Sequence, residues 1–345
     1  MKRFLVLIVI LFAGCGESDP DSDQNSSQGI TPEVIEQVNA SGTITDEQAE
    51  ILSKVEGVVD LNCLTSITDT QAENLSKLRS IRLNGLTSIT DHQAESLSKI
   101  SGTVGLGGLT SITDEQAESL SKVSYLILNG LTSITDEQAE SLSKVDFILD
   151  LNGLTSITDE QAESLSKAEG LTLNGLASIT EEQAESLSKV SRIGLNGLSF
   201  ITDEQAESLS KVVGSLNLNG LSSITDKQAE NLSKAESSLF LNGLTSITDR
   251  QAEILSNISG GTVGLSGLTS ITDTQAKSLS KVYSLNLNGL TSITDKQAES
   301  LGKCDYLLLN GLASITDEQA ESLSKVMNLQ IPPSCQELVD KYKEP

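Results

Sequence analysis

The sequence has no tryptophan, one histidine, four cysteines and only 3% aromatic residues in 345. So few aromatic rings disfavour a large globular core, and the 37% apolar residues are mainly leucine, isoleucine, valine and alanine, which suit a narrow core. A single histidine leaves little basis for acid–base catalysis, and no Cys–His pair is evident. We therefore expect a binding or structural protein, not an enzyme.

Positive charge is also scarce. Lys and Arg number 23 against 48 Asp and Glu, which gives a formal net charge of −25. Because such a surface repels phosphate backbones, nucleic acid is excluded as a partner. We interpret the charge as a solvated helical face, with weak divalent-cation binding as the alternative. No zinc spacing and no phosphate-binding glycine loop occur, so we predict no metal site and no cofactor.

What the chain does have is a repeat of 22 to 24 residues carrying the motif I-T-D-x-Q-A-x-x-L. A unit this short holds one strand and one short helix, so it buries its apolar face only by stacking on its neighbours. The pattern predicts an α/β solenoid over residues 44–326. Thirteen copies begin at Ile44, Ile67, Ile89, Ile112, Ile134, Ile157, Ile179 (with Glu181 for Asp), Ile201, Ile224, Ile247, Ile271, Ile293 and Ile315.

One repeat, residues 124–145, shows what each unit is expected to do. Leu126 and Leu128 alternate with Ile127, which predicts a very short strand, and the following Asn-Gly indicates a turn. Thr135 with Gln138 three residues later is a capping-box pattern. The apolar stripe continues through Leu142 to Val145, which predicts a helix of about two and a half turns.

The stretch L-x-L-N-G-L-x-x-I-T-D-x-x-A-x-x-L-S, as at 171–188, resembles the leucine-rich repeat, closest to the subclass L-x-L-x-G-C-x-x-I-T-D. This resemblance implies a horseshoe of 12 to 13 repeats, with a parallel sheet on the concave side and short helices outside. The chain departs from the subclass in having Leu where its buried Cys or Asn stands. That departure removes the side chains that normally satisfy loop carbonyls. The single histidine, His92, replaces an exposed Glu of one helix and is expected to lie on the surface.

The first residues predict export. Lys2 and Arg3 precede a short apolar run, Phe4 to Phe12, which is typical of a signal peptide and too short to span a membrane. Small residues followed by Cys15 resemble the lipobox of bacterial lipoproteins, which implies that Cys15 is lipidated. Ordinary secretion with an incidental cysteine is the alternative. We predict a signal peptide at 1–14, a lipid-anchored tether at 15–29 and a location in the cell envelope, at the outer membrane or cell surface.

Both ends of the array carry expected caps. An N-terminal helix with Pro32 near its start is predicted within 30–43, and a strand stop followed by a polar helix over 336–343 within a C-terminal cap at 327–345. These caps predict an array that is closed at both ends. Three further cysteines remain, Cys63, Cys304 and Cys335. A Cys304–Cys335 disulfide is conceivable in an exported protein, but isolated thiols are favoured.

Residues before and between the strand leucines should point to the concave face, and there the repeats differ most. Tyr125, Ile127, Ile148 and Asp150 are expected to form one mixed patch. We hypothesise that a protein or surface polymer binds this face; a stalk-like structural protein whose concave variation is neutral drift is the alternative. Further candidate residues on the same face are Arg82, Arg192 and Phe240.

Overall fold

The computed structural model describes residues 31–236, 238–258 and 260–343. The predicted signal peptide, Cys15 and the tether lie outside the described residues. Two helices come first, and from the second one on helices and strands alternate along the chain. The first half comprises α1 (Thr31–Ser41), α2 (Asp46–Leu52), β1 (Val58–Asp60), α3 (Asp69–Leu75), β2 (Ser80–Arg82), α4 (Asp91–Leu97), β3 (Thr103–Gly105), α5 (Asp114–Leu120), β4 (Tyr125–Ile127), α6 (Asp136–Leu142), β5 (Ile148–Asp150), α7 (Asp159–Leu165), β6 (Gly170–Thr172) and α8 (Glu181–Leu187).

The second half continues the same order. It comprises β7 (Arg192–Gly194), α9 (Asp203–Leu209), β8 (Ser215–Asn217), α10 (Asp226–Leu232), β9 (Ser238–Phe240), α11 (Asp249–Leu255), β10 (Thr262–Gly264), α12 (Asp273–Leu279), β11 (Ser284–Asn286), α13 (Asp295–Leu301), β12 (Tyr306–Leu308), α14 (Asp317–Leu323), β13 (Asn328–Gln330) and α15 (Pro333–Asp340).

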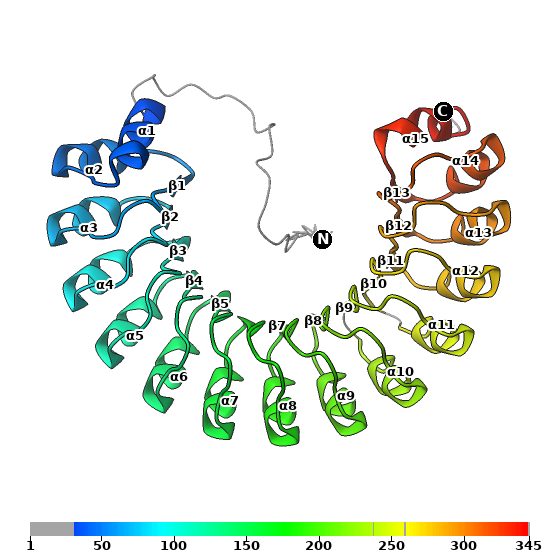
Figure 1. Ribbon diagram of the computed structural model, residues 1–345, viewed down its shortest axis with the longest axis horizontal. Helices are drawn as coiled ribbons and strands as arrows, with labels where there is room; N and C mark the ends of the chain where they lie inside the picture. The colour runs from blue at the N-terminus through cyan, green and yellow to red at the C-terminus, as the bar shows by residue number, and fades with distance from the viewer. Residues whose placement is uncertain (1–30, 237, 259, 344–345) are drawn as a thin grey trace, which may run out of the picture.

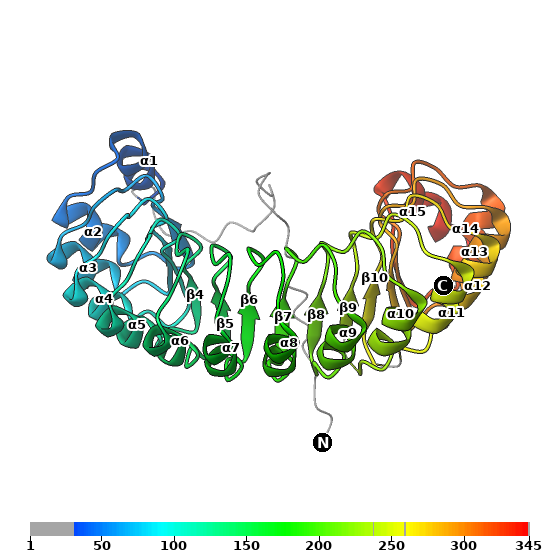
Figure 2. The ribbon, with the colours of Figure 1, turned by 60° about the horizontal axis from the view of Figure 1, so that its bottom comes forward.

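The strands form one parallel sheet in chain order, β1 to β13. The sheet lines the inside of an arc and the helices lie outside it, as Figure 1 shows. Figure 2 shows the middle strands side by side along the inner wall. Strands stack about 4.8 Å apart while helices need about 8–10 Å, so the array must curve toward the sheet. The predicted horseshoe is confirmed.

The core runs the length of the arc between sheet and helices. Each strand from β1 to β12 buries its middle residue, and the next leucines of the repeat are buried as well; in the repeat of β5 these are Leu149, Leu151 and Leu154, all 0% exposed. The alanine and leucine of the facing helix, Ala162 and Leu165, complete the layer. Because every unit shares this layer with its neighbours, the short elements are stabilised by stacking.

The capping box predicted from the motif is present in every helix from α2 to α14. In α6 the Thr135 hydroxyl accepts from the Gln138 N–H, and Gln138 Oε1 accepts from the Thr135 N–H at 3.0 Å. The helices are shorter than predicted, because α6 ends at Leu142 with Ser143 as its C-cap. Val145 is buried, but it lies in a turn beyond the helix end. Its N–H donates to the Leu142 carbonyl at 3.2 Å.

The same glutamine also joins each repeat to the one before it. The Gln Nε2 donates to the main-chain oxygen of the isoleucine that opens the preceding motif, as Gln161 does to Ile134 at 2.9 Å. Twelve such bonds of 2.7–3.0 Å run from α3 to α14. This glutamine ladder satisfies one loop carbonyl in each of twelve repeats, a role that no side chain at the Leu position takes here.

A second ladder follows the ends of the strands. Most of the asparagines there are half-buried, and nine accept a bond from the main-chain N–H at the same position of the next repeat, over 2.8–3.0 Å. Gly107 and Ser266 stand at this position without a side-chain amide, and no such bond leads from them to the next repeat. At the C-terminal end the position is Pro332, which has no N–H to donate.

The glycine after this asparagine is imposed by close packing between repeats. A Cβ at Gly175 would overlap the carbonyl oxygens of Asn152 and Leu154 in the preceding repeat. The first strand-bearing repeat carries Cys63 at this position, because helix α1 precedes it there. The Cys63 thiol lies 3.0 Å from Asn39 Oδ1 and 3.5 Å from the Val38 carbonyl.

A helix lies at each end of the arc, α1 at one and α15 at the other (Figure 1). Val34 and Val38 of α1 and Cys335 and Val339 of α15 join the buried core. The C-terminal helix begins at Pro333, earlier than predicted, and ends at Asp340. Cys304 and Cys335 are both buried free thiols, so the conceivable disulfide between them is absent. No helix in the described part of the chain is long and apolar enough to cross a bilayer.

Candidate binding face

The concave face is made by the first and third residues of each strand. In β4 and β5 these residues are half-exposed on either side of a buried leucine. Only four of the strand residues carry charge: Asp60, Arg82, Asp150 and Arg192. The acidic residues that dominate the composition lie mostly on the outer helices. The inner wall therefore differs chemically from the rest of the surface.

The structure brings the predicted patch together. In the parallel register Tyr125 lies beside Ile148, and Ile127 lies beside Asp150. The sequence missed a fifth member, Phe147, whose ring stacks on Tyr125 with centroids 5.5 Å apart and planes 12° apart. Phe147 is 47% exposed, an unusual position for a phenylalanine. We call these five residues the β4–β5 patch.

Asp150 is the polar member of the patch and is partly buried. Asn129 Nδ2 donates to Oδ2 at 3.3 Å, and the Asn152 N–H donates to Oδ1 at 3.2 Å. Burial raises the pKa of Asp150 above its ordinary value, while the Thr172 hydroxyl, Asn129 and Asn152 act in the opposite direction. Thr172 Oγ1, beside Asp150 in the register, is itself buried and makes no hydrogen bond of standard geometry to any described residue.

Arg82, Arg192 and Phe240 lie on the same face but apart from the patch, on β2, β7 and β9. Both arginines meet a carboxylate at long range: Arg82 Nη1 lies 3.9 Å from Asp60 Oδ2, and Arg192 Nη2 lies 3.8 Å from Glu169 Oε1. These exposed pairs contribute little stability. Phe240 leans over Gly264 on the next strand, where a Cβ would meet its ring.

A second aromatic group lies near the C-terminal end of the sheet. Tyr283 and Tyr306 pack with centroids 5.0 Å apart and planes 53° apart, and Tyr283 is 50% exposed. The pair lies at β11 and β12, on the opposite side of the arc from β4 and β5 (Figure 1). Tyr306 opens β12, and Tyr283 comes immediately before β11; neither was among the candidate residues that the sequence indicated.

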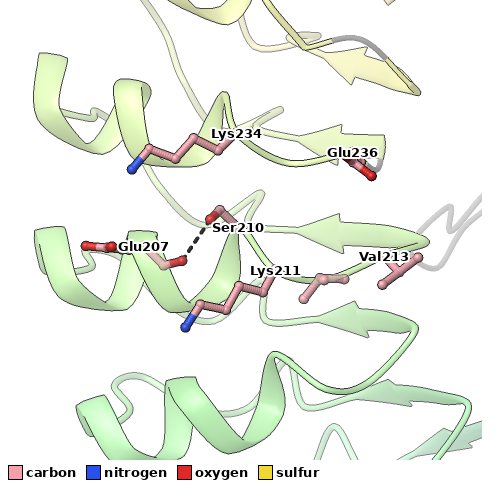
Figure 3. A pocket seen from close by; sticks show the side chains of 7 residues that line it. Glu207, Ser210, Lys211, Val213, Lys234 and Glu236 are labelled. Atoms are coloured by element: carbon pink, nitrogen blue, oxygen red, sulfur yellow. Dashed lines mark hydrogen bonds between the residues drawn. The ribbon is translucent and has the colours of Figure 1, made fainter.

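Other surface features are weaker candidates for a functional site. A shallow depression of about 350 Å³ follows α9 and α10 and is lined by Glu207, Ser210, Lys211, Val212, Val213, Lys234 and Glu236 (Figure 3). Its ionisable side chains are exposed, and the hydroxyl of Ser210, which is buried, is already used in a bond to the Glu207 carbonyl at 2.7 Å. His92 is exposed, as expected, and bonds Glu73 Oε1 at 2.9 Å, which raises its pKa. No cluster of metal-ligating side chains occurs within the described part of the chain.

The inner parallel sheet, outer helices and leucine layer define a leucine-rich-repeat solenoid. No protein-family model matches the chain, and no curated protein does. Among solved structures, an internalin from Listeria monocytogenes is similar at 17% identity over 91% of this chain and 92% of that one, with a TM-score of 0.37. A chain of the Toll–Spatzle complex of Drosophila is similar at 16% identity, with a TM-score of 0.47; the match covers 77% of this chain and 41% of that one.

Proposed function

We propose that this chain is a non-enzymatic binding scaffold that recognises a protein through its concave face. The observation that carries the proposal is the β4–β5 patch, where two stacked rings, two isoleucines and one carboxylate lie together on two neighbouring strands. Exposed aromatic side chains beside apolar ones are typical of interface anchors. The backbone beneath them is already held by the glutamine and asparagine ladders. Binding a partner therefore costs little additional conformational entropy in the strands.

The proposal includes a location. The charged n-region, short apolar run and Cys15 support export and lipid anchoring in the bacterial envelope, with residues 16–29 as a polar tether. Such an anchor would hold the horseshoe close to a membrane surface while leaving its inner wall accessible. The runner-up is a stalk-like structural protein of the envelope, which would need no patch at all. A surface polymer is the alternative ligand.

Capture from bacterial envelope fractions by the full chain tests this proposal. Replacing Tyr125 and Ile127 by serine removes two members of the patch without touching the core. The matched control is Phe200→Ser, which removes an aromatic ring that is 63% exposed in a loop away from the strands. We expect the double variant to lose the captured protein and the control to retain it. Equal capture by all three proteins would overturn the concave-face proposal.

A further inference from the structure

The charges of the inner wall are unevenly matched. Of the four charged strand residues, Asp60 and Arg82 face each other, and Arg192 faces Glu169. Asp150 alone forms no ion pair with any residue that the structure describes. It is also the most enclosed of the four carboxylate and guanidinium groups, since Asp60, Arg82 and Arg192 are exposed. The patch therefore contains a partly desolvated negative charge without a counter-ion.

Such a group is unfavourable unless something compensates it. Three neutral groups surround the Asp150 carboxylate: Asn129 and the Asn152 N–H donate long bonds of 3.3 and 3.2 Å, and the Thr172 hydroxyl lies beside it. The hydroxyl of Thr172 next to it is buried and makes no standard hydrogen bond among the described residues. The polar atoms here are thus incompletely satisfied within the chain itself, in contrast to the ladders that run beside them.

From this arrangement we propose that Asp150 receives a cationic side chain, lysine or arginine, from the protein partner, with apolar residues of that partner lying on the β4–β5 patch. This inference rests on the proposed function and specifies its partner. The surroundings suit the whole of such a side chain. Ile127 and Ile148 offer apolar surface to its aliphatic stem, and the stacked Tyr125 and Phe147 rings offer faces that attract cations.

The net charge of the chain also favours a basic partner. A formal net charge of −25 attracts a basic partner and raises its rate of encounter. The acidic helices provide that attraction over long range. The inner wall then selects among basic partners, because only a cation flanked by apolar residues satisfies both Asp150 and its neighbours.

Two synthetic peptides test the inference on the full chain. One is acetyl-Ala-Leu-Lys-Phe-Ala-amide, and the other carries norleucine in place of lysine, which removes the charge and keeps the apolar stem. Binding is followed through the methyl NMR signals of Ile127 and Ile148. We expect the lysine peptide to bind about tenfold more tightly than the norleucine peptide. Asp150→Asn should abolish this preference, and the control Asp60→Asn should leave it intact.

The possible outcomes distinguish the requirement for a cation at Asp150 from binding at the concave face as such. If both peptides shift Ile127 and Ile148 with equal affinity, concave-face binding stands and the cationic requirement is wrong. If neither peptide shifts these methyl signals, the inference is also wrong, and the proposed function is judged by the capture experiment alone. If both peptides shift only signals of the outer helices, the concave-face proposal fails together with the inference.

Discussion

Gln161 Nε2 donates to the main-chain carbonyl of Ile134 over 2.9 Å, across the boundary between two repeats. The same side chain accepts the Thr158 N–H through Oε1 at 3.0 Å. One amide group therefore caps its own helix and ties it to the preceding unit. This double role accounts for the glutamine at this position in the twelve copies whose helices, α3 to α14, follow another repeat.

Replacing Gln161 by alanine should be costly because it removes both bonds and leaves a main-chain carbonyl without a partner. We expect the free energy of unfolding to fall by about 2–3 kcal/mol, measured by urea denaturation. Gln48→Ala is the matched control, since Gln48 makes only the capping bonds in the described structure. Its cost should be about 1 kcal/mol. Equal losses in the two variants would show that the inter-repeat bond contributes nothing.

Gly175→Ala should destabilise the array by about 3 kcal/mol, because the added methyl group overlaps two carbonyl oxygens of the preceding repeat. Those oxygens belong to the backbone, so the repeats would have to move apart. At the same repeat position Cys63→Ala should change stability by less than about 1 kcal/mol, since Cys63 already has a Cβ. Thermal unfolding followed by circular dichroism compares them. A tolerated alanine at 175 would mean that the repeats stack less closely than described.

Asp150→Asn tests the cost of the enclosed carboxylate. Because burial raises the folded pKa of Asp150 above its ordinary 3.8, the native state binds this proton more tightly than the unfolded state does. The contribution of Asp150 to stability is therefore greatest below pH 4 and declines as pH rises through the folded pKa. The Asn variant should be at least as stable as the wild type at pH 7, and this advantage should vanish near pH 3. Urea midpoints at both pH values measure it; a variant that is clearly weaker at pH 7 would contradict the assignment.

The buried thiols should be unreactive in the native chain. Burial, with a smaller contribution from Asp305, raises the pKa of Cys304 to about 12, so at pH 8 only about one thiol in ten thousand is ionised. Cys304 and Cys335 should stay unmodified by iodoacetamide for hours and react within minutes in 8 M urea. Peptide mapping by mass spectrometry assigns each site. Rapid native modification of Cys304 would mean that the C-terminal repeats open readily.

The sequence predicted the elements of each repeat because their causes are local. Thr135 and Gln138 lie within one turn, so the capping box could be read directly from the motif. The acceptor of the glutamine Nε2 could not be read from the motif. It belongs to a residue 26 to 28 positions away, and the contact depends on how two units stack. The helix end was misplaced for a related reason: Val145 continues the apolar period but is buried from a turn.

In the β4–β5 patch, too, the sequence predicted what local alternation decides and missed what depends on contacts between repeats. Alternation within each strand placed Tyr125, Ile127, Ile148 and Asp150 on the inner face, and the parallel register brought them together. Phe147 was missed because it precedes the strand, where alternation no longer decides the direction of a side chain. The enclosed state of Asp150 also depends on bonds from Asn129 of the preceding repeat and from the Asn152 N–H, which the sequence did not predict.

Site-specific photo-cross-linking in the native envelope tests most directly whether the inner wall is the binding surface. A benzophenone amino acid is placed at Tyr125 in one variant and at Phe200 in another, so that each probe replaces an aromatic residue, half-exposed at 125 and exposed at 200. Irradiation is predicted to join the first variant, and not the second, to a protein of one discrete mass. A discrete product from position 200 alone, or none from 125, would contradict the account.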